Sequence, residues 1–129
     1  MTDRTVLVAD DDPRLVQAIK SRLESAGFEV ETAQDAYQAV ALTRRVKPAI
    51  LVLDINMPAG NGFTVHERLK KLSDVRDTPV IYVTGEDPLQ VDKLARDMDA
   101  YGVLHKPFYV SDLVVMIMEA TASSSVEAS

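Results

Sequence analysis

The sequence of 129 residues contains no cysteine and only two histidines. The absence of cysteine excludes a disulfide framework, a thiolate nucleophile and a Cys-based zinc site. His66 and His105 lie far apart in the sequence and form no HExxH-type pair. We interpret both as structural residues, with His105 packed or hydrogen-bonded on a strand and His66 solvated on a helix surface. Any reaction chemistry is therefore expected from other side chains.

Long hydrophobic runs and excess positive charge are also missing. The apolar runs are no longer than strands, and Met1–Arg4 lacks the basic-then-apolar pattern of a signal peptide, so we expect a cytoplasmic protein without membrane contact. Fourteen Lys and Arg residues face 20 Asp and Glu residues, a net charge of −6. This balance argues against direct binding of nucleic acid by this domain. A hydrophobic content of 47% at this length fits one domain with one core.

Five short apolar runs alternate with five amphipathic segments along the chain. The runs, each expected to form a strand, are Val6–Ala9, Phe28–Ala33, Ile50–Leu53, Val80–Val83 and Val103–His105. The expected helices start at Asp12–Pro13, Asp35, Phe63 (ending at Leu72), Asp87–Pro88 and Ser111–Asp112. Because strand–helix–strand units cross over right-handedly, this order predicts an α/β fold: a (βα)5 doubly wound parallel sheet with helices on both faces. The expected strand order is the flavodoxin-like 2-1-3-4-5.

Polar side chains stand at the carboxyl end of four of these runs. Asp10 and Asp11 follow the first run, Asp54 the third, Thr84 the fourth, and Lys106 the fifth. In open parallel sheets the carboxyl ends of the strands border one crevice, where ligands bind. The sequence therefore predicts a single site built from these residues.

The predicted crevice gathers three carboxylates, and this limits its chemistry. Two such charges 4 Å apart repel by roughly 4 kcal/mol at an effective dielectric constant of 20, so a cation is needed to compensate. Mg²⁺, which prefers oxygen ligands, fits a site without Cys or His better than zinc does. Lys106 supplies a second positive charge. An aspartate beside a metal, a lysine and a hydroxyl suggests phosphoryl transfer through an aspartyl phosphate.

Together these residues resemble the receiver domain of two-component response regulators. The resemblance rests on Asp10–Asp11, Asp54–Pro58 followed by Gly62, Thr84, and Lys106–Phe108, and it extends from about Arg4 to Ala120. It implies a receiver domain over residues 1–120, with a Ser/Ala-rich tail or linker over 121–129.

The resemblance also implies a role for each residue of the site. Asp54 would accept a phosphoryl group from the phosphohistidine of a sensor histidine kinase or a histidine phosphotransfer protein, and Thr84 and Lys106 would bind that group. Mg²⁺ would be held by Asp11, by Asp54 and by the backbone carbonyl of Asn56, with Asp10 acting through water. The domain would catalyse only its own phosphorylation and dephosphorylation, so we do not expect an enzyme with an external substrate. The bond between Lys106 and Pro107 is expected to be cis.

Two alternative functions remain open at this stage. A phosphatase of the haloacid dehalogenase type is also Mg²⁺-dependent with an Asp nucleophile, but such enzymes resemble Asp-x-Asp-x-Thr after the first strand, whereas Asp54 follows the third. A pseudo-receiver that only docks partners is the other alternative. Retention of Asp11, Asp54, Thr84 and Lys106 argues against it.

Two further features concern the output of the domain. Val103 stands three residues before Lys106, where receivers often carry a switching aromatic residue, which puts the usual coupling of hydroxyl and ring in doubt. The last helix contains six consecutive apolar residues, Leu113–Met118, which is more than one helix face can bury. We expect a homodimer or effector contact through this helix, formed by residues among Val114, Val115, Met116, Ile117 and Met118.

Overall fold

The structure is a computed structural model that describes residues 4–58 and 60–128, with side chains up to residue 122. Five parallel strands form one sheet: β1 (Thr5–Ala9), β2 (Glu29–Ala33), β3 (Ile50–Asp54), β4 (Val80–Thr84) and β5 (Gly102–His105). Their order is β2-β1-β3-β4-β5, so the predicted topology is confirmed. Residues 1–3 and Ser129, which the sequence assigned to the domain and the tail, lie outside the described residues.

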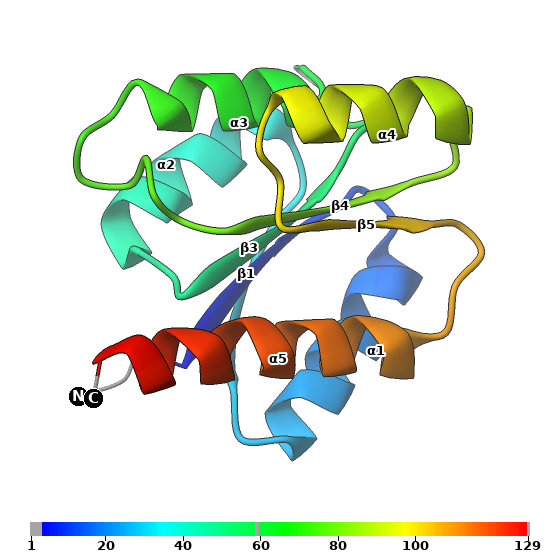
Figure 1. Ribbon diagram of the computed structural model, residues 1–129. Coiled ribbons are helices and arrows are strands. Elements are labelled where there is room, and N and C mark those ends of the chain that lie inside the picture. The colour runs from blue at the N-terminus through cyan, green and yellow to red at the C-terminus, as the bar shows by residue number, and fades with distance from the viewer. Residues whose placement is uncertain (1–3, 59, 129) are drawn as a thin grey trace.

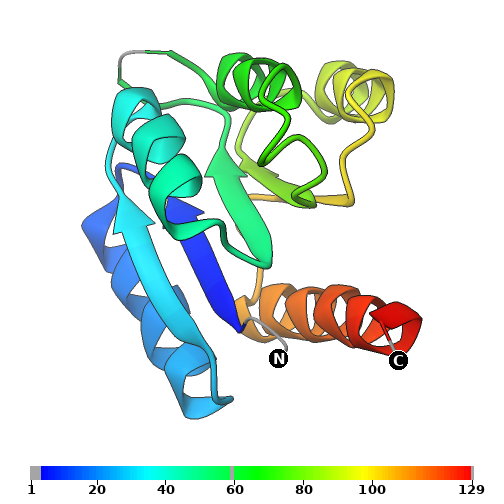
Figure 2. The same cartoon turned by 90° about the vertical axis from the view of Figure 1, so that its left-hand side faces the viewer.

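Five helices cover the sheet on both faces. They are α1 (Pro13–Ser25), α2 (Ala36–Val46), α3 (Gly62–Lys70), α4 (Pro88–Asp97) and α5 (Val110–Ala128). Figures 1 and 2 show α1 and α5 on one face and α2, α3 and α4 on the other. None of the helices in the described part of the chain combines the length and the apolar character needed to cross a membrane.

The helix starts follow the predicted capping residues. Asp12 accepts hydrogen bonds through Oδ1 from the backbone N–H groups of Arg14 and Leu15, and Pro13 takes the first helical position. Asp35 and Asp87 cap α2 and α4 in the same way. These side chains satisfy backbone donors that a helix leaves unpaired at its first turn. The strand ends and the helix starts are thereby fixed at the same edge of the sheet.

The buried strands point alternate side chains into two apolar layers. One layer, under α2, α3 and α4, includes Leu7, Leu51, Leu53 and Tyr82. The other, under α1 and α5, includes Val8, Val52, Ile81 and Val83. This alternation explains why β1, β3 and β4 are apolar at nearly every position: both faces of a parallel sheet are covered.

Some sequence-based boundaries shift in the structure. Helix α3 spans Gly62–Lys70 rather than Phe63–Leu72, and α5 begins at Val110 and continues through the expected tail to Ala128. The capping residue Asn61 starts α3 one residue earlier, because its side chain accepts the N–H of Thr64. Terminal residues of helices are the part of a helix that sequence patterns place least precisely.

Two predicted side-chain environments are wrong. His66 is buried, not solvated, because the hydroxyl of Tyr82 lies 2.5 Å from its Nδ1 and gives the ring a polar partner in the core. In α5, Val114 and Ile117 are also buried, under the sheet layer shared with α1, so these two cannot form a surface contact. Among the described side chains of α5, Val115 and Met118 are the large apolar ones that remain exposed.

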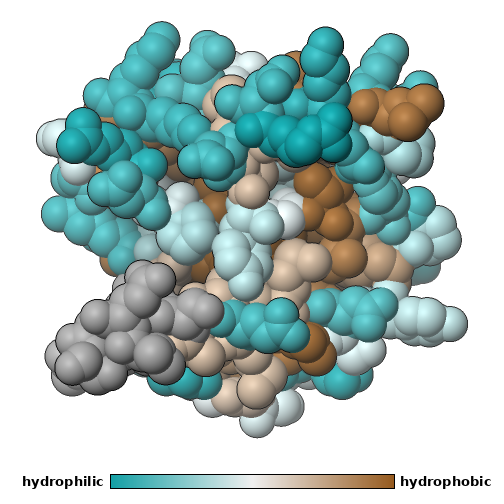
Figure 3. Space-filling view, in the orientation of Figure 1, coloured by the Kyte–Doolittle hydropathy of each residue, from teal (hydrophilic) through white to brown (hydrophobic). Residues whose placement is uncertain are grey.

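The surface between α4 and α5 is partly apolar. In Figure 3 brown and tan atoms cross the middle of this face, while the outer side of α3 and α4 is mostly teal. Large hydrophobic residues with exposed side chains on α4, on α5 or directly before β5 are Leu89, Leu94, Tyr101, Val115 and Met118.

Candidate phosphorylation site

The predicted site residues meet at the carboxyl end of the sheet. Asp10 follows β1 and Asp54 ends β3, the strand hydrogen-bonded to β1. Carboxylate oxygens of Asp10, Asp11 and Asp54 lie within 4.8 Å of one another. The parallel register therefore brings together residues that are more than 40 positions apart in the sequence.

Lys106 reaches into this acidic cluster from the loop after β5. Its Nζ lies 3.1 Å from Oδ2 of Asp10 and 3.5 Å from Oδ2 of Asp54. Both carboxylates are almost fully buried. One ammonium group thus offsets part of the repulsion between two buried carboxylates. The cis bond between Lys106 and Pro107, which the sequence led us to expect, is confirmed.

The pKa values of Asp54 and Lys106 are both raised above their ordinary values. Burial, together with the nearby charge of Asp10, raises the pKa of Asp54 to about 6, although Lys106 and the N–H of Asn56 act in the opposite sense. Burial alone would lower the pKa of Lys106. The hydrogen bond to Asp10 and the charges of Asp10 and Asp54 outweigh it and raise that pKa above its ordinary value. At neutral pH the site therefore holds a carboxylate at Asp54 and an ammonium at Lys106.

Asp10 and Asp11 have different surroundings. Oδ2 of Asp10 accepts from Lys106, and Oδ1 accepts from the backbone N–H of Asp12 at 2.9 Å. Asp11 is exposed, and its carboxylate has no hydrogen-bond or ion-pair partner within the described part of the chain. Of these two residues, Asp11 is therefore the one whose carboxylate is free to bind a metal ion directly.

Thr84 stands beside the site but its hydroxyl is oriented by the following loop. Oγ1 of the buried Thr84 accepts the backbone N–H of Glu86 at 2.9 Å. The backbone carbonyl of Thr84 accepts the N–H of Lys106, which fixes β4 and the β5 loop to each other. Because its oxygen is the acceptor, the hydrogen of the Thr84 hydroxyl remains available for donation to a bound group.

Sequence reasoning missed Glu86 as part of the site. The side-chain amide of Asn56, in the loop after β3, donates a hydrogen bond to the carboxylate of Glu86, in the loop after β4. The backbone N–H of Asn56 also donates to Oδ1 of Asp54 at 3.2 Å. The sequence could have indicated Glu86, because it is an acidic residue two positions beyond Thr84, at the same edge of the sheet.

Gly62 allows the loop after β3 to lie close to Asp54. A Cβ atom at this position would come within 2.8 Å of the backbone oxygen of Asp54, closer than real Cβ atoms approach. Its N–H donates to the carbonyl oxygen of Ile55. Glycine at this position is therefore required for the close approach of α3 to the site.

Comparison with known proteins identifies the family. The family model described as "Response regulator receiver domain" matches residues 6–118. The chain belongs to this family. Receiver domains are the regulatory modules of two-component signalling systems, and this chain is one of them. No finding favours a haloacid dehalogenase-like phosphatase.

Relatives by sequence are longer transcriptional regulators. The DNA-binding dual master transcriptional regulator RpaA of a Synechocystis species is 32% identical over 112 residues, which cover 87% of this chain and 46% of RpaA. The transcriptional regulatory protein TrcR of Mycobacterium tuberculosis is 35% identical over 122 residues, covering 93% of this chain and 46% of TrcR. The chain thus spans about half the length of these relatives.

Solved structures support the same assignment. The receiver domain of the Francisella response regulator 1452 has a TM-score of 0.88 at 27% identity, covering 95% of this chain and 99% of that one. The chemotaxis response regulator CheY4 of Vibrio cholerae has a TM-score of 0.84 at 29% identity, covering 92% and 99%.

Proposed function

We propose that this receiver domain accepts a phosphoryl group on Asp54. The observation that carries the proposal is the buried Asp54 carboxylate 3.5 Å from the Lys106 ammonium, in a cluster that also contains Asp10 and Asp11. A pKa of about 6 leaves Asp54 mostly ionised at neutral pH, which is the form that acts as a nucleophile.

The phosphodonor is a phosphohistidine of a sensor histidine kinase or a histidine phosphotransfer protein. One oxygen of Asp54 attacks the phosphorus, an O–P bond forms, the N–P bond breaks, and the electron pair of that bond stays on the imidazole of the donor. Lys106 neutralises charge on the phosphoryl oxygens, and the Thr84 hydroxyl donates a hydrogen bond to one of them. The domain acts only on itself in this reaction and turns over no external substrate.

The donor set fits Mg²⁺. Three clustered carboxylates with neither Cys nor His among them are oxygen ligands of the kind that a hard divalent cation prefers. Asp11, whose carboxylate is unpartnered among the described residues, and Asp54 would hold the ion directly with the backbone carbonyl of Asn56. Asp10, whose two oxygens accept from Lys106 and Asp12, would act through water. When bound, the ion supplies positive charge that stabilises the transferring phosphoryl group.

The output is a change of partner. The relatives that match this chain are regulators about twice its length, which supports an effector that works on transcription. We place the effector in another domain or another protein, because the net charge of −6 disfavours nucleic-acid binding by the receiver itself.

Phosphorylation with a small phosphodonor tests the proposal. The parent chain, incubated with acetyl phosphate and Mg²⁺, should gain the mass of one phosphoryl group, stable in acid and labile in base, and Asp54→Asn should gain none. Asp12→Asn is the matched control, because it removes a neighbouring charge while asparagine caps α1 equally well. Labelling of Asp54→Asn at the level of the parent would place the phosphate elsewhere. Absence of labelling in the parent would support the docking-only alternative.

A further inference from the structure

A cavity of about 630 Å³ opens at the amino end of the sheet, at the opposite end of the strands from the phosphorylation site. Its walls come from α3, from the loop before β4 and from the loop before β5. The polar or charged residues that line it are His66, Lys70, Arg76, Asp77, Thr78, Asp99 and Tyr101. None of these residues takes part in the proposed phosphoryl transfer, so that reaction does not account for the cavity.

The deepest polar group of this cavity is the ring of His66, which is only 3% exposed. Its Nδ1 lies 2.5 Å from the hydroxyl of Tyr82. Within the described part of the chain that hydroxyl has no other acceptor, so Tyr82 donates and Nδ1 accepts. The proton of the neutral ring therefore sits on Nε2, which has no protein partner among the described residues and is left to face the cavity.

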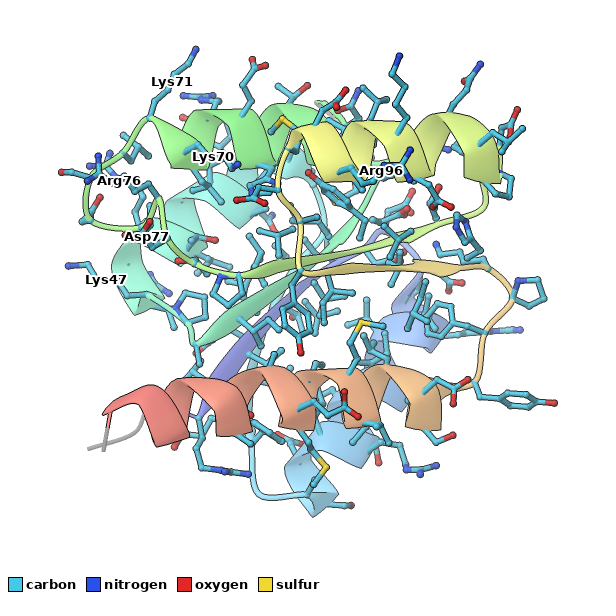
Figure 4. All side chains as sticks on the ribbon, in the orientation of Figure 1. Lys47, Lys70, Lys71, Arg76, Asp77 and Arg96 are labelled. Carbon is cyan, nitrogen blue, oxygen red and sulfur yellow. The ribbon has the colours of Figure 1, made fainter. Side chains whose placement is uncertain are left out.

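Lys70 adds a positive charge beside this N–H donor. It lies one turn beyond His66 on α3, and its charge helps to lower the pKa of His66 to about 4, after the larger effect of burial. Figure 4 shows Lys70 on the sheet side of α3, whereas Lys71 points away from the sheet. Lys70 forms no ion pair among the described residues. The base of the cavity thus offers hydrogen-bond donors and positive charge.

The rim of the cavity carries both signs of charge. Arg76, Asp77 and Asp99 are exposed there, and none of them forms an ion pair in the described ranges. The helix dipole accounts for basic residues near the end of α3, but it does not account for a buried imidazole with a free N–H beside them. Because the two rim carboxylates would repel a purely anionic ligand, a ligand with charges of both signs suits the cavity best.

We propose that this cavity binds a small zwitterion of the amino-carboxylate class. Its carboxylate accepts hydrogen bonds from Nε2 of His66 and from the Lys70 ammonium at the base. Its ammonium group lies at the rim, near the carboxylates of Asp77 and Asp99. The residues of this cavity are separate from those of the phosphorylation site.

Titration of the ¹⁵N-labelled chain, followed by NMR, tests the site directly. The probes are acetate, ethylammonium, and amino carboxylates of increasing length: glycine, 4-aminobutyrate and 6-aminohexanoate. At least one amino carboxylate should shift the amides of Thr78 and Ala100 and the Nε2 signal of His66, with an affinity about tenfold above that of acetate. If no amino carboxylate binds more tightly than acetate, or if the shifts arise at the acidic site instead, the proposal is wrong.

Two variants with the same change of charge localise the binding. Lys70→Gln should weaken binding of the best probe by about tenfold or more, since one charge-assisted hydrogen bond is lost. Lys71→Gln, the adjacent exposed lysine outside the cavity, should bind as the parent does. If both variants weakened binding of the probe equally, the effect would come from the overall charge of the protein, and the proposed site would be wrong. The ¹⁵N spectrum of the His66 ring is a second check, because a proton on Nδ1 would remove the proposed donor.

Discussion

Nζ of Lys106 lies closer to Asp10, at 3.1 Å, than to the phosphoacceptor candidate Asp54, at 3.5 Å. The contact with Asp10 joins residues 96 positions apart, the loop after β5 to the end of β1. Asp10, which follows β1, thus holds the Lys106 ammonium in place. The ammonium also lies close to Asp54, at the end of the neighbouring strand β3. Before phosphorylation the lysine has a structural role as well as the proposed chemical one.

Replacing Lys106 with methionine should therefore destabilise the fold. The variant leaves Asp10 and Asp54 buried without a cation, and removing one partner of a buried ion pair costs about 3 kcal/mol or more. We expect a lower free energy of unfolding in urea at pH 7.5 with EDTA, and partial recovery when Mg²⁺ replaces EDTA. Lys93→Met, at an exposed position of α4, is the control and should change little. Equal stability of Lys106→Met and the parent in EDTA would contradict the pairing.

The raised pKa of Asp54 predicts a pH-dependent effect of Asp54→Asn. The folded-state pKa of about 6 exceeds the unfolded value of 3.8, so this carboxyl contributes stability that is fully present below pH 4 and is lost as the pH rises through 6. Asparagine does not ionise. In EDTA the variant should be more stable than the parent at pH 7.5, by up to about 3 kcal/mol, and the difference should shrink toward pH 4.

Urea unfolding at several pH values between 4 and 7.5 measures this difference. His66, whose pKa is lowered to about 4, titrates in the same range but is common to both chains, so its effect cancels. Asp12→Asn, which removes another carboxyl group near the site, is measured alongside as the control. A constant difference for Asp54→Asn would mean that its carboxyl does not carry the raised pKa.

The sequence was sufficient for the parts of the molecule that depend on local patterns. Asp12 and Pro13 predicted the start of α1, and the apolar runs before Asp54 and Thr84 predicted where β3 and β4 end. The parallel order of the strands then placed the carboxylates together without further information. Local capping and strand-end signals therefore determined most of the candidate site.

Features that depend on contacts between distant elements could not be predicted. The burial of His66 requires a hydroxyl on β4, Tyr82, whose position opposite α3 no local pattern indicates. In α5 a run of six apolar residues has no periodicity, so it could not show that Val114 and Ile117 face the core and Val115 and Met118 face solvent. The hydrogen bond between Asn56 and Glu86 likewise depends on how two loops approach each other.

Asp11→Ala should abolish or strongly weaken Mg²⁺ binding while leaving the fold intact. Asp11 is exposed and its carboxylate makes no hydrogen bond to any other described residue, so its removal opens no cavity and relieves some repulsion from Asp10 and Asp54. We expect affinity for Mg²⁺ to fall by about tenfold or more in calorimetric titration, as when any direct ligand of an oxygen site is lost. Asp12→Asn should retain the affinity of the parent. An Asp11→Ala chain that binds Mg²⁺ as the parent does would place the ion elsewhere.

Tyr82→Phe should destabilise the core by about 1–2 kcal/mol, because Nδ1 of the buried His66 loses its only hydrogen-bond donor among the described residues. The ring itself and its edge-on contact with Phe63 remain, so little packing is lost. The measurement is the urea midpoint at pH 7.5. Tyr101→Phe removes a hydroxyl from a half-exposed ring and should be close to neutral. If both variants have the same small effect, the hydrogen bond between Tyr82 and His66 adds nothing to stability.

The exposed apolar residues of α5 predict self-association of the phosphorylated chain. Val115 is 52% exposed and Met118 47% exposed, whereas Met116 is half-buried and packs on β5, where a Cβ at Gly102 would clash with its sulfur. Apolar surface of this kind on a soluble domain commonly marks a contact, and methionine adapts to one. We expect a second copy of this chain to cover it.

Analytical ultracentrifugation with and without acetyl phosphate and Mg²⁺ tests this contact. The phosphorylated parent should form a dimer, and the double variant Val115→Glu, Met118→Lys should remain a monomer with unchanged unfolding, since both positions face solvent. Val114→Lys is the opposite control: it places a charge in the core beneath α5 and should unfold the domain rather than separate a dimer. If the phosphorylated parent is a monomer at every concentration, dimerisation through α5 is excluded. Val115 and Met118 would then be expected to bind a separate effector instead.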